Sequence, residues 1–107
     1  MLETTVQDVK AKLDAGDAVH LIDVREAQEV AICTLPGAEH IAMMPLFLGM
    51  KKTAAAQDAE IVVYCHHGIR SLEAAKFLQM QGFENVKSMT GGIEEWASAI
   101  DPSMRRY

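Results

Sequence analysis

The sequence has few cysteines, few basic residues and no long hydrophobic segment. Its 107 residues include two cysteines, Cys33 and Cys65, which is too few for a disulfide-stabilised scaffold. Lysines and arginines total 10 against 15 aspartates and glutamates, and a net charge of −5 argues against nucleic-acid binding. The longest apolar stretch, residues 41–50, is interrupted by Pro45 and Gly49 and is too short to cross a bilayer, so no membrane association is expected.

The N-terminal residues 1–5 lack the basic start and apolar segment of a secretory signal. Because unpaired cysteines suit a reducing compartment, we expect a cytoplasmic protein. Hydrophobic residues make up 50% of the chain and charged residues 23%, as in an ordinary globular domain. No linker, repeat or low-complexity tract divides the chain, so residues 1–107 are expected to form one domain.

Strand-like and helix-like segments alternate along the chain. Apolar runs at 19–24 and 60–64 predict buried strands, and shorter strands are expected at 40–41 and 86–89. Apolar residues at helical spacing lie between these runs. This alternation predicts an α/β fold with a mostly parallel sheet covered on both faces.

Capping residues mark where two of the predicted helices begin and end. Thr5, followed by a carboxylate in the first turn, predicts the start of a helix that ends at Gly16. Ser71 is expected to be the N-cap of a longer helix that ends at Gly82.

The methionine-rich segment 43–50 has two interpretations. Pro45 is expected to begin a helix that runs through Met50 and beyond, because proline fits a first helical turn. We expect Leu46 and Leu48 in the core and leave the methionines open between core filler and an adaptable partner surface.

The residues that follow the second long strand carry most of the chemical information. The strand ends at Cys65, and the short loop 66–70 leads into the helix expected at Ser71. Loop amides in such a strand-to-helix turn are expected to face the loop centre and form an anion site with the helix N-terminus. Gly68 permits the backbone angle that the turn requires. An anion site beside Cys65 favours its thiolate, which is the nucleophilic form.

This loop, residues 65–70, resembles the active-site loop of rhodanese-type sulfurtransferases, in which a cysteine carries sulfur as a persulfide. Three further segments are similar to the same family. Residues 21–26 are similar to its Asp-Val-Arg segment, 35–38 to its Pro-Gly-Ala turn, and 90–96 to its closing Gly-Gly-x-x-x-Trp helix. Four segments in the family's order form a strong signal, although each alone would be weak.

The resemblance implies a rhodanese-like fold, with a mostly parallel five-stranded sheet and helices on both faces. It also implies an enzyme of the thiosulfate:cyanide sulfurtransferase class. Such an enzyme moves a sulfane sulfur from a donor such as thiosulfate to a thiophilic acceptor through a Cys65 persulfide. This chemistry requires no cofactor and no metal.

The expected site consists of the nucleophile and the loop around it. Cys65 is the catalytic residue, and the substrate-binding residues are His66, His67, Gly68, Ile69, Arg70 and Ser71. The amides of residues 66–71 are expected to hold the persulfide, and Arg70 an anionic donor such as thiosulfate. For His66 and His67, charge near neutral pH and contact with the acceptor both stay open. Arg70 and the two histidines equally fit solvated loop positions.

Four residues outside the loop carry an expected position or role: Asp23, Arg25, Trp96 and Cys33. Asp23 and Arg25 are expected to support the site structurally, without direct chemistry. Trp96 is expected in the core. Cys33 stands where many family members have the glycine of Gly-His-Ile, and a buried cysteine is favoured there over a second sulfur relay.

Other functions fit the sequence less well. Cysteine phosphatases and arsenate reductases of the same fold place five residues between cysteine and arginine, whereas four separate Cys65 from Arg70. A shorter loop forms a smaller anion site, which suits one sulfur atom better than a phosphate. Non-catalytic rhodanese-like binding modules usually lack the cysteine. A metal site at residues 65–67 is disfavoured, because adjacent residues rarely converge on one ion.

Two segments resemble a rhodanese subgroup fused to, or working beside, the adenylating enzymes of ubiquitin-like sulfur carriers. These segments are residues 32–36 and 100–107. The expected partners are therefore a small sulfur donor and a protein, either a sulfur acceptor or a sulfur-carrier adenylating enzyme.

Overall fold

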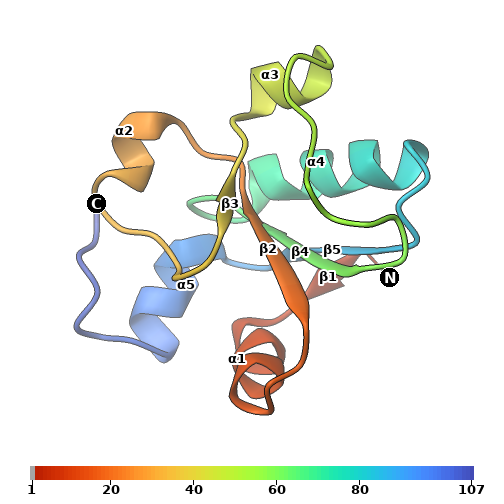
Figure 1. Cartoon of the computed structure of the whole chain (residues 1–107). Coiled ribbons are helices and arrows are strands. Elements are labelled where there is room, and N and C mark those ends of the chain that lie inside the picture. The colour runs from red at the N-terminus through yellow and green to blue at the C-terminus, as the bar shows by residue number, and fades with distance from the viewer. Residues whose placement is uncertain (1) are drawn as a thin grey trace.

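The computed structural model describes residues 2–107, which are built around a five-stranded sheet (Figure 1). Its strands are β1 (Glu3–Thr4), β2 (Val19–Asp23), β3 (Glu39–His40), β4 (Glu60–Tyr64) and β5 (Asn85–Met89). Their order across the sheet is β1-β5-β4-β2-β3, and all neighbouring strands are parallel. β4 is central, so the residue that follows it lies in the middle of one sheet edge.

Residues 2–107 contain five helices, four of which cover the two faces of this sheet, as the sequence predicts (Figure 1). They are α1 (Val6–Asp14), α2 (Ala27–Val30), α3 (Met43–Phe47), α4 (Ile69–Met80) and α5 (Gly92–Ala99). α1 and α5 pack on one face, and α3 and α4 pack on the other. No helix within residues 2–107 is long and apolar enough to cross a membrane.

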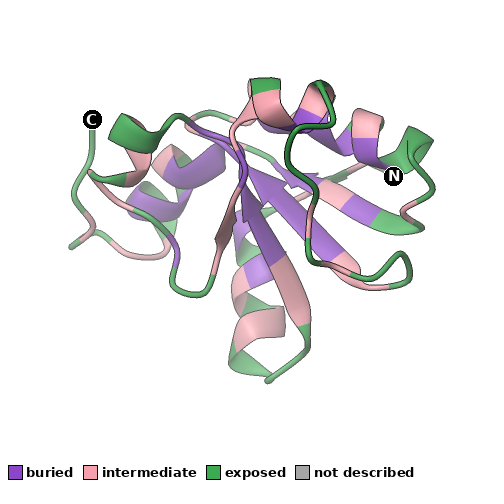
Figure 2. Cartoon of the chain, turned by 45° about the horizontal axis from the view of Figure 1, so that its top comes forward, coloured by how far each residue is buried: buried purple, intermediate pink, exposed green. Residues whose placement is uncertain are grey.

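The sheet separates two hydrophobic cores, and the buried residues concentrate along its strands (Figure 2). Successive side chains of a strand point to opposite faces. In β4, Ile61 and Val63 therefore pack towards α3 and α4, whereas Val62 and Tyr64 pack towards α1 and α5. Trp96 lies in the second core, as predicted.

The structure confirms the predicted N-cap of α1 but not that of α4. α1 follows the prediction, with the Thr5 hydroxyl accepting a hydrogen bond from the Asp8 amide at 3.1 Å. The prediction for α4 was wrong, because its N-cap is Gly68 and Ser71 is already helical. Gly68 has a φ of +99°, which glycine adopts with little strain, so the chain turns into the helix earlier than expected. Ser71 is thereby fully buried.

The prediction for the methionine-rich segment was also wrong in its boundaries. α3 begins at Met43 and ends at Phe47, so Pro45 lies within its first turn and does not begin the helix. Backbone N–H groups in the first turn have no partner within the helix, so the helix tolerates proline there, which lacks an N–H group.

The side chains of this segment divide between core and surface. Leu46 is buried as predicted, but Leu48 is 64% exposed and its predicted core position was wrong. Leu48 is the C-cap, so the chain leaves the helix before that side chain turns towards the sheet. Met43 packs against the core, whereas Met44 and Met50 are exposed.

Candidate functional site

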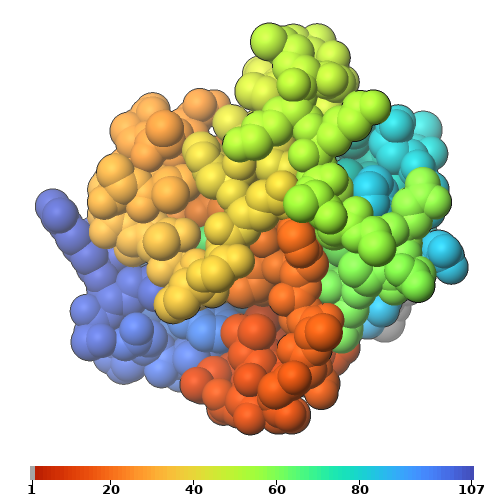
Figure 3. Space-filling view, viewed as in Figure 1, coloured from red at the N-terminus to blue at the C-terminus, as the bar shows by residue number. Residues whose placement is uncertain are grey.

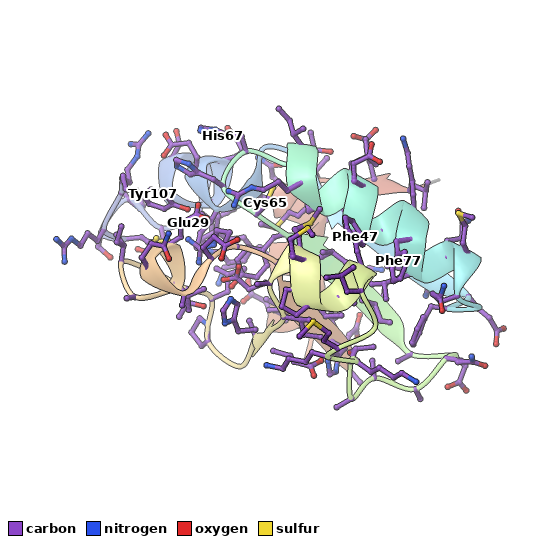
Figure 4. The ribbon with its side chains drawn as sticks, turned by 90° about the horizontal axis from the view of Figure 1, so that it is seen from above. Glu29, Phe47, Cys65, His67, Phe77 and Tyr107 are labelled. Carbon is purple, nitrogen blue, oxygen red and sulfur yellow. The ribbon has the colours of Figure 1, made fainter. Side chains whose placement is uncertain are left out.

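Cys65 lies directly after β4, at the carboxyl end of the central strand (Figure 4). Ligands of parallel sheets bind at this edge. The residue is 1% exposed, so its sulfur is below the surface. The loop from Cys65 to Gly68 then passes directly into α4.

Hydrogen-bond donors from the start of α4 surround the sulfur. The amides of Gly68 and Ser71 donate to Cys65 Sγ at 3.1 and 3.4 Å, and Ser71 Oγ lies 3.5 Å from it. Ser71 Oγ also hydrogen-bonds Ser88 Oγ of β5 at 2.6 Å. Two amides at a helix N-terminus are well placed to stabilise negative charge on sulfur.

The start of α5 fixes the backbone of the same loop. The amide of Ile93 donates to the Cys65 carbonyl at 2.9 Å, and that of Glu94 donates to the His66 carbonyl at 3.1 Å. Gly92, which has a φ of +62°, lies so close that a Cβ atom there would sit 2.5 Å from the Cys65 carbonyl oxygen. The Gly-Gly segment therefore permits a close contact between the helix and the loop.

Arg70 is occupied by a partner that sequence reasoning missed. Its Nη1 and Nη2 donate to Oε1 and Oε2 of Glu29 at 2.7 and 2.9 Å. The hydrogen bonds to Glu29 raise the pKa of Arg70. The same bonds are the main reason that the pKa of Glu29 is lowered to about 2. The guanidinium expected to bind an anionic donor is instead held by a carboxylate.

His66 is covered by Tyr107. The two rings stack with centroids 3.8 Å apart and an angle of 12° between their planes. Burial, followed by the nearby His67, lowers the pKa of His66. The structure thus favours an uncharged His66 at neutral pH over the charged alternative.

The remaining loop residues lie nearer the solvent. His67 is exposed, and its ring centroid lies 3.9 Å from that of His66. Ile69 is 78% exposed on the first turn of α4. These two side chains and Arg70 form the outer part of the loop.

Asp23 and Arg25 form a fully buried ion pair behind the loop. Arg25 Nη2 donates to Asp23 Oδ2 at 2.7 Å, and its Nε donates to Oδ1 at 3.0 Å. Arg25 also donates to the carbonyls of Cys33 and Glu29 at 2.6 and 3.3 Å, and to the Tyr107 hydroxyl at 2.9 Å. The pair therefore braces the segment that carries Glu29.

Cys33 is half-buried beside the core between the sheet and α5, and both cysteines are free thiols. Among residues 2–107, no three His, Cys, Asp or Glu side chains are grouped to hold a metal ion.

Sequence reasoning missed Glu29, Ser88 and Tyr107 because their partners lie far away along the chain. Glu29 carried a local signal, since it closes a capping box with Glu26, but this motif marks a helix start and not a site. Figure 3 shows the C-terminal segment, in dark blue, beside the orange segment that includes α2. The Tyr107 hydroxyl donates to Glu29 Oε2 at 2.8 Å, and Figure 4 labels both residues.

Comparison with known proteins supplies an independent result. A family model for the rhodanese-like domain matches residues 5–99. The Bacillus subtilis protein YtwF, named as a sulfurtransferase, is 36% identical over 100 residues, which are 94% of this chain and 94% of YtwF. MoeZ of Mycobacterium tuberculosis, named as an adenylyltransferase/sulfurtransferase, is 34% identical over 96% of this chain, which spans 26% of MoeZ.

Among solved structures, the human single-domain sulfurtransferase TSTD1 has a similar fold. Its TM-score is 0.83 at 22% sequence identity, over 92% of this chain and 97% of that one. At this identity the likeness shows the fold alone.

Proposed function

Because the chain belongs to the rhodanese-like domain family, we propose that it is a sulfurtransferase in which Cys65 carries the transferred sulfur as a persulfide. The observation that carries the proposal is the position of Cys65 Sγ, which accepts hydrogen bonds from the Gly68 and Ser71 amides. In this proposal residues 1–107 act as one rhodanese domain.

The proposed reaction has two displacement steps on sulfur. The Cys65 thiolate attacks the sulfane sulfur of a donor, for thiosulfate its outer sulfur, and sulfite leaves with the bonding electron pair. The new persulfide, Cys65–S–S⁻, keeps the negative charge that the thiolate carried. An acceptor nucleophile then attacks the outer sulfur, and the Cys65 thiolate leaves. Loop amides stabilise the anionic sulfur in both states.

The geometry supports sulfur transfer over phosphate chemistry. The amide donors converge on a single buried sulfur atom, and the arginine at the end of the loop is paired with Glu29. A phosphatase of this kind requires a free cation and a wider loop for its oxyanion.

We further propose a protein partner for the acceptor half-reaction. The chain matches part of MoeZ, whose name joins an adenylyltransferase to a sulfurtransferase. This supports delivery of sulfur to a protein acceptor or to a sulfur-carrier adenylating enzyme. The two free thiols support a reducing location such as the cytoplasm.

Intact-mass measurement tests the proposed persulfide. The protein is incubated with thiosulfate and, separately, with glutathione persulfide, next to the variants Cys65→Ser and Cys33→Ser. We expect the wild type and Cys33→Ser to gain one sulfur atom that cyanide removes, and Cys65→Ser to gain none. A gain in Cys65→Ser, or no gain in the wild type with either donor, would overturn the proposal.

A further inference from the structure

We propose that Glu29 is a specificity-determining residue, which holds Arg70 away from dianionic donors and so favours persulfides over thiosulfate as the sulfur source. The inference rests on the proposed Cys65 sulfur transfer and names the substrate class of that same site.

The first support is the geometry of the pair. Both terminal nitrogens of Arg70 are engaged by the two oxygens of Glu29, at 2.7 and 2.9 Å. A bidentate arginine–carboxylate pair uses the planar fork that would otherwise bind an oxyanion. An incoming thiosulfate must therefore compete with a carboxylate that is already in place.

The second support is that Glu29 is itself held from three sides. Besides Arg70, the Tyr107 hydroxyl donates to its Oε2 at 2.8 Å and the Glu26 amide donates to its Oε1 at 3.1 Å. Tyr107 is fixed in turn by the buried Arg25, whose Nη1 donates to the same hydroxyl at 2.9 Å. This network restricts the motion of the Glu29 carboxylate, which keeps its other two donors if Arg70 moves.

The third support is the charge of the surroundings. The Glu29–Arg70 pair has no net charge, and Arg106 is likewise paired with Glu94. His66 is covered by Tyr107 with a lowered pKa, and the neighbouring Ile69 is exposed and apolar. Thiosulfate brings two negative charges with its reacting sulfur and releases sulfite, whereas the reacting –S–SH group of a persulfide carries at most one. Such surroundings favour the less charged reacting group.

Sulfur transfer from a persulfide, RS–SH, involves only the donor and Cys65. The Cys65 thiolate attacks the outer sulfur of RS–SH, one S–S bond forms and one breaks, and RS⁻ leaves as Cys65–S–SH is produced. The sulfane sulfur is passed on with no external oxidant or reductant.

The test compares two donors in the variant Glu29→Gln. Glutamine keeps an oxygen that accepts from the Glu26 amide but removes the charge that holds Arg70. We expect kcat/KM for thiosulfate to rise about tenfold, and that for glutathione persulfide to change less than about twofold, because one rim charge is lost. The readout is the initial rate of Cys65 persulfide formation by mass spectrometry.

One control variant and one combination make the result specific. Glu73→Gln makes the same substitution at an exposed carboxylate of α4, which pairs with Lys76 at 3.5 Å and takes no part in the Glu29 network. It is not expected to change the ratio of the two rates. Arg70→Ala is expected to cost more thiosulfate activity in the Glu29→Gln background than in the wild type, because only the freed guanidinium binds the donor.

An unchanged donor ratio in Glu29→Gln would overturn the inference, as would an equal rise in Glu73→Gln or a gain that survives Arg70→Ala. Failure of the proposed function gives a different pattern: either the wild type gains no sulfur from either donor, or the gain of sulfur persists when Cys65→Ser is added to each variant.

Discussion

At the residue scale, the sulfur of Cys65 lies below the surface while its polar partners come from the start of α4. Ser71 contacts the sulfur and also Ser88 of the neighbouring strand, so three positions form one hydrogen-bonded chain. The sulfur is shielded from bulk water and accepts hydrogen bonds from two backbone amides. This suits a persulfide, which is anionic and reactive.

Glu29 gives a prediction for stability against pH. In the folded protein its pKa is lowered from an ordinary 4.5 to about 2, chiefly by the hydrogen bonds from Arg70. A carboxylate with a lowered folded pKa stabilises the fold fully above pH 4.5, and this contribution disappears as the pH falls towards 2. After allowance for solvent screening, we expect it to be about 1–2 kcal/mol.

Urea unfolding of the wild type and Glu29→Gln at several pH values measures this contribution. The wild type should be the more stable protein at pH 7, and the difference should shrink steadily between pH 5 and about pH 2. A difference that stays constant over this range would show that Glu29 is not linked to protonation in this way.

At the scale of elements, the site depends on how closely α5 approaches the loop after β4. Gly92 makes this contact possible, and we expect Gly92→Ala to destabilise the fold by about 3 kcal/mol or more, from backbone strain and overlap with two carbonyls. The added Cβ would lie 2.4 Å from the His66 carbonyl oxygen and 2.5 Å from that of Cys65. Because these carbonyls belong to the loop, persulfide formation should slow as well.

Gly16→Ala is a matched control for this prediction. Gly16 also has a positive φ, of +80°, but no atom lies within 4 Å of the position of its Cβ. We expect a cost of about 1 kcal/mol from backbone strain alone and an unchanged rate of persulfide formation. Equal unfolding midpoints for the two variants would contradict the importance of the α5–loop contact.

At the scale of the whole molecule, Arg25 connects segments that are distant in the sequence. It joins Asp23 at the end of β2 to the carbonyls of Glu29 and Cys33 and to the Tyr107 hydroxyl. We expect Arg25→Met to cost about 3–5 kcal/mol, because methionine fills part of the volume but leaves the Asp23 charge buried and unpaired. The measurement is the free energy of unfolding in urea.

The exposed pair of Lys10 and Asp14 provides the comparison. Lys10 Nζ lies 2.9 Å from Asp14 Oδ1 on the surface of α1, and Lys10→Ala should cost less than about 0.5 kcal/mol. If the two variants lost similar stability, the buried pair would not have the bracing role that its contacts indicate.

The sequence by itself determined the alternation of helices and strands after residue 5, the family and the position of Cys65 at the end of the central strand, but it did not predict the two-residue strand β1. These features depend on local periodicity, turn residues and short motifs, which are visible in a single stretch of chain. Its errors arose where local signals competed. Pro45 and Ser71 are both compatible with a helix start, yet α3 begins at Met43 and α4 follows Gly68.

The tertiary structure alone decided which groups surround the nucleophile. Arg70 and Glu29 are 41 residues apart in the sequence, Tyr107 and Glu29 are 78 apart, and Ser71 and Ser88 are 17 apart. Residue types limit which of these pairs are possible, but none carries a local pattern that names its partner. The choice among possible partners is made by the packing of the sheet and its helices, which brings side chains from separate elements to one edge.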